Sequence, residues 1–216
     1  MPTRAIGLLL FLPVPLVLFL FTRAPLGILP SLGIGIVLTL THRVYARPWA
    51  LARAGARCLW CGADVAATAL AAVELVLEDP LGRASWCACR EAHARSVRAA
   101  LAWAASRRLF LTFGILGTLG VFLAWAAGSQ LLAPSRLPHD DAVAFFRLGI
   151  AACVLPLGWL SARSDPASGE APRSPFPLHV PALVGLRTVL WLFRLVGLLW
   201  LAQGSLHVAQ RVARLV

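Results

Sequence analysis

Long apolar segments alternate with short polar ones along this chain, and the apolar segments are long enough to cross a membrane. Residues 5–22 and 24–41 each contain 18 residues without a charge, and residues 109–132 contain 24. Because an α-helix rises about 1.5 Å per residue, such segments cover a hydrocarbon core of about 30 Å. Two further apolar segments, residues 142–162 and 184–208, are interrupted only by arginines. The pattern predicts an all-α polytopic membrane protein with about five transmembrane helices.

The first two segments are separated by a single charge, Arg23, and are expected to form a helical hairpin. A re-entrant hairpin is the alternative, and it would leave four spans. A cleaved signal peptide is a further alternative, but the sequence Thr22-Arg23-Ala24-Pro25 lacks the small-x-small cleavage pattern.

Composition supports a membrane protein and excludes several classes. Apolar residues make up 59% of the chain, charged residues only 13%, and the mean hydropathy is +0.78, which excludes a soluble globular domain and a disordered tail. The net charge of +11 comes from arginine alone, because the chain contains neither lysine nor asparagine. Without lysine there is no P-loop or Schiff-base lysine. We expect no nucleic-acid partner, because the positive charge flanks apolar segments.

The distribution of arginine predicts the orientation. Residues 42–108 carry ten arginines, whereas the turn at Arg23 and the loop at residues 133–141 carry one each. Cytoplasmic loops are enriched in arginine close to the spans. We therefore expect an integral protein, of the bacterial inner-membrane type, whose N-terminus and long loop are cytoplasmic.

These features divide the chain into three expected parts. Residues 1–45 form a transmembrane hairpin, residues 46–108 a cytoplasmic loop, and residues 109–216 a three-helix transmembrane region. A connector rich in proline, serine and glycine, residues 163–179, interrupts the last part.

The cytoplasmic loop contains one group of residues with recognisable chemistry. Cys58 and Cys61 stand in a C-x-x-C-G motif, in which two thiolates can bind one metal ion while Gly62 permits a tight turn. Cys89 and His93 are four residues apart, which places them on one face of a helix. Together they predict a tetrahedral zinc site.

The segment between the two pairs predicts a β-hairpin. Residues 73–77 are rich in β-branched side chains, residues 78–82 have turn chemistry, and residues 83–87 can return as the second strand. A helix is then expected to start at or near Ser85 and to continue through Arg98.

This order of elements resembles a treble-clef zinc finger: a cysteine turn (the zinc knuckle), then a β-hairpin, then a helix that carries the last two ligands. The resemblance covers residues 58–93 only. The resemblance implies a small α+β finger with Cys58 and Cys61 in the knuckle and with Cys89 and His93 on the helix. Cys87 is an additional thiol that could replace either Cys89 or His93 as a ligand.

Three other interpretations of the cysteines stay open. One is an iron–sulfur cluster on Cys58, Cys61, Cys87 and Cys89, and another is a thioredoxin-like redox pair. The third is a catalytic zinc with Glu91 as its base, but four available ligands favour a closed structural site.

Two arginines lie within the last apolar segment. Arg187 and Arg194 are seven residues apart and share one helix face, and no acidic residue lies deep in an expected span. A lipid phosphate, a helix carbonyl, a bound anion or another subunit could meet their charge.

The sequence therefore predicts a non-enzymatic membrane protein with structural zinc. We expect a scaffold, an assembly factor or an accessory subunit, with membrane lipids and other membrane subunits or further copies of the chain as partners. The alternative is a membrane enzyme or transporter that binds an anionic lipid or a small anion through Arg187 and Arg194.

Overall fold

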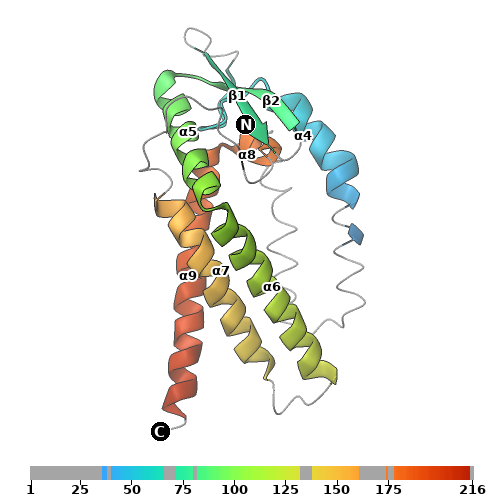
Figure 1. The fold of residues 1–216 in the computed structure, drawn as a ribbon, viewed down its shortest axis with the longest axis vertical. Helices are drawn as coiled ribbons and strands as arrows, with labels where there is room; N and C mark the ends of the chain where they lie inside the picture. Colours follow the sequence, from blue (N-terminus) through green and yellow to red (C-terminus); the bar gives the residue numbers. More distant parts are fainter. Residues whose placement is uncertain are drawn as a thin grey trace. The chain divides into compact units, whose positions relative to one another are not determined.

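Over the residues that it describes, the computed structural model is mainly helical and contains one two-stranded sheet (Figure 1). It describes residues 36–37, 40–65, 72–79, 82–131, 138–160, 174 and 178–214. Most of the first two expected spans therefore lies outside the described residues. The chain divides into two compact units: unit 1 comprises residues 1–102 and 165–189, and unit 2 comprises residues 103–164 and 190–216.

The elements follow one another in a simple order. They are η1 (a π-helical turn, His42–Ala46), α4 (Arg47–Ala54), β1 (Val73–Asp79), β2 (Gly82–Ala88), α5 (Glu91–Ser106), α6 (Arg108–Leu131), α7 (His139–Leu160), α8 (His179–Val184) and α9 (Leu186–Ala213). The boundary between the two units falls within α5 and within α9.

Unit 1 contains the expected hairpin. Strands β1 and β2 pair antiparallel, with Leu75 opposite Trp86. Side chains alternate between the two faces of a strand, so Leu75 and Trp86 are buried while Glu74 and Ser85 are exposed. The buried face belongs to the same core as residues of α5 spaced at helical intervals, namely Ala94, Val97 and Leu101.

The start of the helix after the hairpin was predicted wrongly. Ser85 pairs with Val76 inside the sheet, and the ladder continues to Ala88. Helix α5 begins only at Glu91. Strand pairing thus overrides the preference of serine for a helix start, because Trp86 and Ala88 gain burial in the strand.

Among the described residues, three helices are long and apolar enough to cross a membrane: α6, α7 and α9. They correspond to the three expected spans at residues 109–132, 142–162 and 184–208. The last of these does not begin at Val184, however. Gly185, with φ +91°, separates α8 from α9.

Within unit 2 the helices contact one another through aromatic rings and small residues. Phe122 of α6 is buried, and its ring centroid lies 4.8 Å from that of Phe146 on α7. On α9, a Cβ added at Gly197 would lie 2.7 Å from Leu155 and 3.1 Å from Val154. The absence of a side chain at Gly197 therefore lets α7 and α9 approach closely.

Gly114, Gly117 and Gly120 recur every three residues along α6, and one of these three positions makes a close contact. A Cβ at Gly114 would lie 2.6 Å from the sulfur of Cys153 on α7. No described atom lies within 4 Å of the corresponding points at Gly117 and Gly120.

This difference between glycines predicts opposite effects of adding one methyl group. Gly117→Ala should keep or raise thermal stability, because alanine favours a helix by about 0.8–1.0 kcal/mol over glycine. Gly197→Ala should lower stability by about 1–3 kcal/mol relative to Gly117→Ala, because Leu155 or the backbone must move. Thermal unfolding of the detergent-solubilised variants measures this difference, and equal midpoints would contradict the α7–α9 contact.

Candidate metal centre

The first pair of candidate ligands lies in a tight turn. The Cys58 N–H donates to the carbonyl of Ala63 at 2.8 Å, and the Gly62 N–H donates to the carbonyl of Cys58 at 2.7 Å. Gly62 has φ +67°, a conformation that side-chain-bearing residues rarely adopt. We refer to residues 58–62 as the knuckle. The conformation of the knuckle is determined by its own residues, because the C-x-x-C-G motif supplies the glycine that the turn requires.

The second pair lies where the hairpin passes into α5. Cys89 follows the last residue of β2, and His93 lies in the first turn of α5. The backbone N–H of Leu59 donates to the carbonyl of Cys87 at 2.8 Å, which fixes the knuckle against β2. Because β2 ends beside the knuckle, Cys89 and His93 lie next to Cys58 and Cys61.

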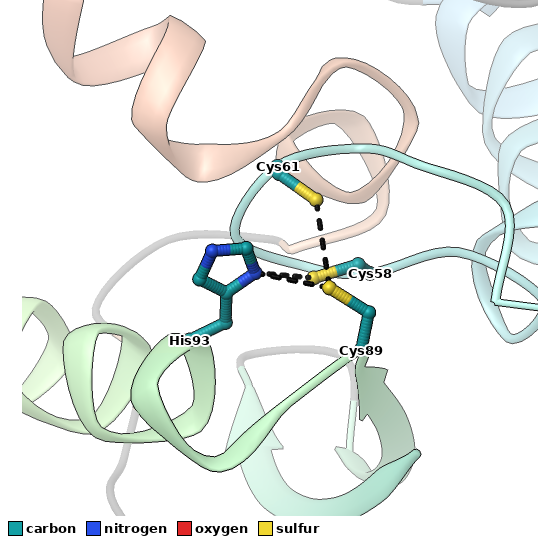
Figure 2. A group of neighbouring side chains, drawn as sticks. All are labelled: Cys58, Cys61, Cys89 and His93. Carbon is teal, nitrogen blue, oxygen red and sulfur yellow. Dashed lines mark hydrogen bonds between the residues drawn. The ribbon is translucent and has the colours of Figure 1, made fainter. Parts of the chain in front are cut away.

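Cys58, Cys61, Cys89 and His93 converge as one group, and their donor atoms all lie within 4.8 Å of one another (Figure 2). The Cys61 and Cys89 sulfurs are 3.9 Å apart, and the Cys58 sulfur lies 3.6 Å from His93 Nδ1. Tetrahedral zinc would space two sulfurs by about 3.8 Å and a sulfur and a nitrogen by about 3.6 Å. Cys89 Sγ and His93 Nδ1 are closer, at 3.1 Å. The group has the dimensions of a site for a single metal ion.

The surroundings favour a thiolate at Cys58. Burial raises the pKa of the Cys58 thiol, but hydrogen bonds from the backbone at Cys61 and Cys89 outweigh it, and the pKa lies below its ordinary value. Cys58 is fully buried, so a thiolate at this position would need a nearby cation.

Cys89 and His93 differ from Cys58. Burial, with the hydrogen bond and charge of Cys58, raises the pKa of Cys89 to about 11, so a metal ion must displace a proton there. Burial and then the charges of Arg90 and Arg187 lower the pKa of His93, which keeps its imidazole neutral. Neutral imidazole is the form that binds metal.

Cys87 does not belong to the group of four. It lies within β2 opposite Glu74. Burial and the charge of Glu74 raise the pKa of its thiol. The structure thus brings Cys89 and His93 to the knuckle, and the set of four cysteines considered for an iron–sulfur cluster is not what converges.

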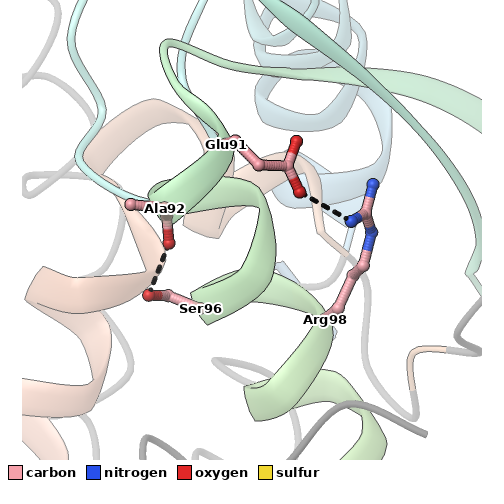
Figure 3. Close-up of polar contacts among 4 residues, drawn as sticks. All are labelled: Glu91, Ala92, Ser96 and Arg98. Atoms are coloured by element: carbon pink, nitrogen blue, oxygen red, sulfur yellow. Dashed lines mark hydrogen bonds and ion pairs between the residues drawn. The ribbon is translucent and has the colours of Figure 1, made fainter. Parts of the chain in front are cut away.

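Glu91, the residue considered as the base of a catalytic zinc, pairs with another side chain. Its carboxylate accepts a hydrogen bond from the guanidinium of Arg98 at 3.1 Å on the exposed surface of α5 (Figure 3). On the same helix the hydroxyl of Ser96 donates to the carbonyl of Ala92 at 2.9 Å. These are contacts of a solvated helix surface.

The two arginines of the last segment have different surroundings. The Arg194 guanidinium donates to the carbonyl of Gly158 at 2.7 Å and lies 5.0 Å from the ring of Trp159 and 5.1 Å from that of Trp191. A helix carbonyl, one of the partners considered for Arg194, therefore accepts from its guanidinium. Arg187 is exposed in the first turn of α9, and its charge acts on His93.

Sequence reasoning missed a second partner of the knuckle, the junction between α8 and α9. The buried guanidinium of Arg57 donates to the carbonyl of Leu183 at 2.9 Å. The backbone N–H groups of Leu186 and Arg187 donate to the carbonyls of Leu59 and Trp60. Nothing in the local sequence relates segments more than 120 residues apart, although a glycine at position 185 is compatible with a break between two helices.

Comparison with known proteins places the chain in no family: no family, no curated protein and no solved structure matches it.

The geometry distinguishes Cys89 from Cys87 as a ligand. Purified protein should contain about one zinc ion per chain, and Cys89→Ser should weaken zinc binding at least about tenfold. Cys87→Ser is the matched control and should leave the affinity unchanged, because Cys87 lies outside the group. Elemental analysis and competition with a chelating dye measure both. Loss of zinc from Cys87→Ser alone would contradict this assignment.

Proposed function

We propose that this chain is an integral membrane protein in which Cys58, Cys61, Cys89 and His93 hold one structural zinc ion. The observation that carries the proposal is the convergence of four donor atoms within 4.8 Å. Three thiolates and an imidazole are a donor set that zinc prefers. The order of knuckle, hairpin and helix supports a treble-clef-like finger over residues 58–93.

A structural role follows from the number of ligands. Four protein ligands complete the tetrahedron, whereas a catalytic zinc leaves one position for water. Glu91 is paired with Arg98 on the helix surface and is not available as a base. In so small a unit, metal binding would contribute much of the folding free energy.

We further propose that the protein has about five transmembrane helices, with α6, α7 and α9 as three of them. The ten arginines of residues 42–108 support a cytoplasmic finger and a cytoplasmic N-terminus in a bacterial inner membrane. In the cytoplasm the thiols of the finger would stay reduced, which suits zinc binding better than disulfide formation.

Reporter fusions test this orientation. A reporter that is active only in the periplasm should be inactive when fused near Gly82 and active when fused within residues 133–141. A cytoplasmic reporter should give the reverse pattern. Periplasmic activity near Gly82 would overturn the orientation without affecting the zinc site.

The cellular role we propose is non-enzymatic: a scaffold, an assembly factor or an accessory subunit. The finger would act as a rigid docking platform for other membrane subunits or for a second copy, and lipids would cover the remaining apolar helix surface. Large exposed side chains on α6, such as Leu109, Phe113 and Leu116, support such contacts within a bilayer. The alternative role in anion binding is less favoured, because Arg194 already has a carbonyl and two indole rings as partners.

Co-purification tests the role of the finger. Cys58→Ser should still insert into the membrane but lose its associated subunits, because the platform unfolds without metal. Cys87→Ser should retain them. Native mass spectrometry of detergent-extracted complexes measures both, and partners that remain bound to the metal-free variant would contradict a docking role.

A further inference from the structure

The last helix begins on the knuckle. The first N–H groups of any helix lack partners within the helix and must be satisfied from elsewhere. At α9, the Leu186 N–H donates to the carbonyl of Leu59 at 2.8 Å, and the Arg187 N–H donates to that of Trp60 at 3.0 Å. Thr188 and Val189 donate back to the carbonyl of Gly185. The knuckle therefore supplies the two external acceptors for the start of α9.

Two glycines allow this contact by bringing backbone against backbone. A Cβ on Gly62 would lie 2.7 Å from the carbonyl carbon of Val184, and a Cβ on Gly185 would lie 2.6 Å from that of Cys61. Both glycines have positive φ values, +67° and +91°. Since backbone atoms on either side cannot move independently of the turn, the position of the α8–α9 junction depends on the conformation of the knuckle.

The metal ligands hold that same conformation. Leu59 and Trp60, whose carbonyls accept from α9, are the two residues between Cys58 and Cys61. A metal ion bound by both sulfurs fixes the turn in which these two carbonyls lie. Without the ion, no bond would hold the two sulfurs at a shared centre, and the turn that carries these carbonyls would lose that constraint.

We propose that metal binding at the knuckle fixes the first turn of α9, so that the metal site acts as a metal-dependent clamp on a helix able to span the membrane. This inference rests on the proposed function, since it requires a metal at the four ligands. By thermodynamic reciprocity, complete loss of the α9 contact must weaken metal binding by the same factor by which metal binding strengthens that contact.

Hydrogen exchange on the full-length protein in detergent tests the clamp directly. When a chelator removes the zinc, the amides of Leu186 and Arg187 should lose protection at least about tenfold, because their acceptors move. The amides of Ala151 and Val154 in α7 should keep theirs. Unchanged protection of Leu186 and Arg187 in protein shown by elemental analysis to have lost its zinc would overturn the clamp and leave the metal site intact.

Two glycine variants test the reciprocal effect. Gly185→Ala should raise the dissociation constant for zinc at least about tenfold, because the methyl group would meet the Cys61 backbone. Gly55→Ala is the matched control, since no described atom lies within 4 Å of its added Cβ and its φ is not positive. Equal zinc affinities in the two variants would refute the coupling. Absence of zinc from the wild-type protein would instead refute the proposed function, and the clamp with it.

Discussion

In unit 1, three cysteine sulfurs and one imidazole nitrogen lie within 4.8 Å of one another, and this group joins the knuckle, the end of β2 and the start of α5. Without a cation, at least one of these sulfurs keeps its proton, as the raised pKa of Cys89 indicates. With a divalent cation, three thiolates leave a net charge of only about −1. Arg90 and Arg187 act electrostatically on His93 in the same group and can balance that remaining charge.

Much of this site was predictable because its determinants are local. The C-x-x-C-G motif specifies a turn, and Gly62 takes the positive φ value that the motif leads one to expect. The β-branched side chains of residues 73–77 predicted a strand, and the structure has one there, β1, with Leu75 buried and Glu74 exposed. The misplaced helix start at Ser85 has a physical cause. Serine is a good first residue for a helix, but cross-strand pairing with Val76 and the burial of Trp86 are stronger.

What escaped prediction is long-range and involves the backbone. The carbonyls of Leu59 and Trp60 accept hydrogen bonds from a helix that begins more than 120 residues later. Every residue has a backbone carbonyl, so the sequence does not indicate which carbonyls make such bonds. The same limit applies to Arg194, whose acceptor is the carbonyl of Gly158. It also applies to the glycines of unit 2, because small residues show where a helix can be approached and not which helix approaches.

Some arginines of this chain have partners that suit a planar guanidinium better than a lysine ammonium. The chain has 20 basic residues, all arginine, and only nine acidic ones, so most positive charges cannot be met by carboxylates. Several are met by indole rings: Arg53 lies 4.4 Å from the ring of Trp49, Arg107 lies 4.7 Å from that of Trp103, and Arg194 lies near two such rings. A planar guanidinium stacks on an aromatic face while its N–H groups still donate in the plane, as Arg194 does to Gly158. A lysine ammonium is more strongly hydrated and lacks this planar geometry, so an Arg194→Lys exchange would keep the charge and lose the stacking.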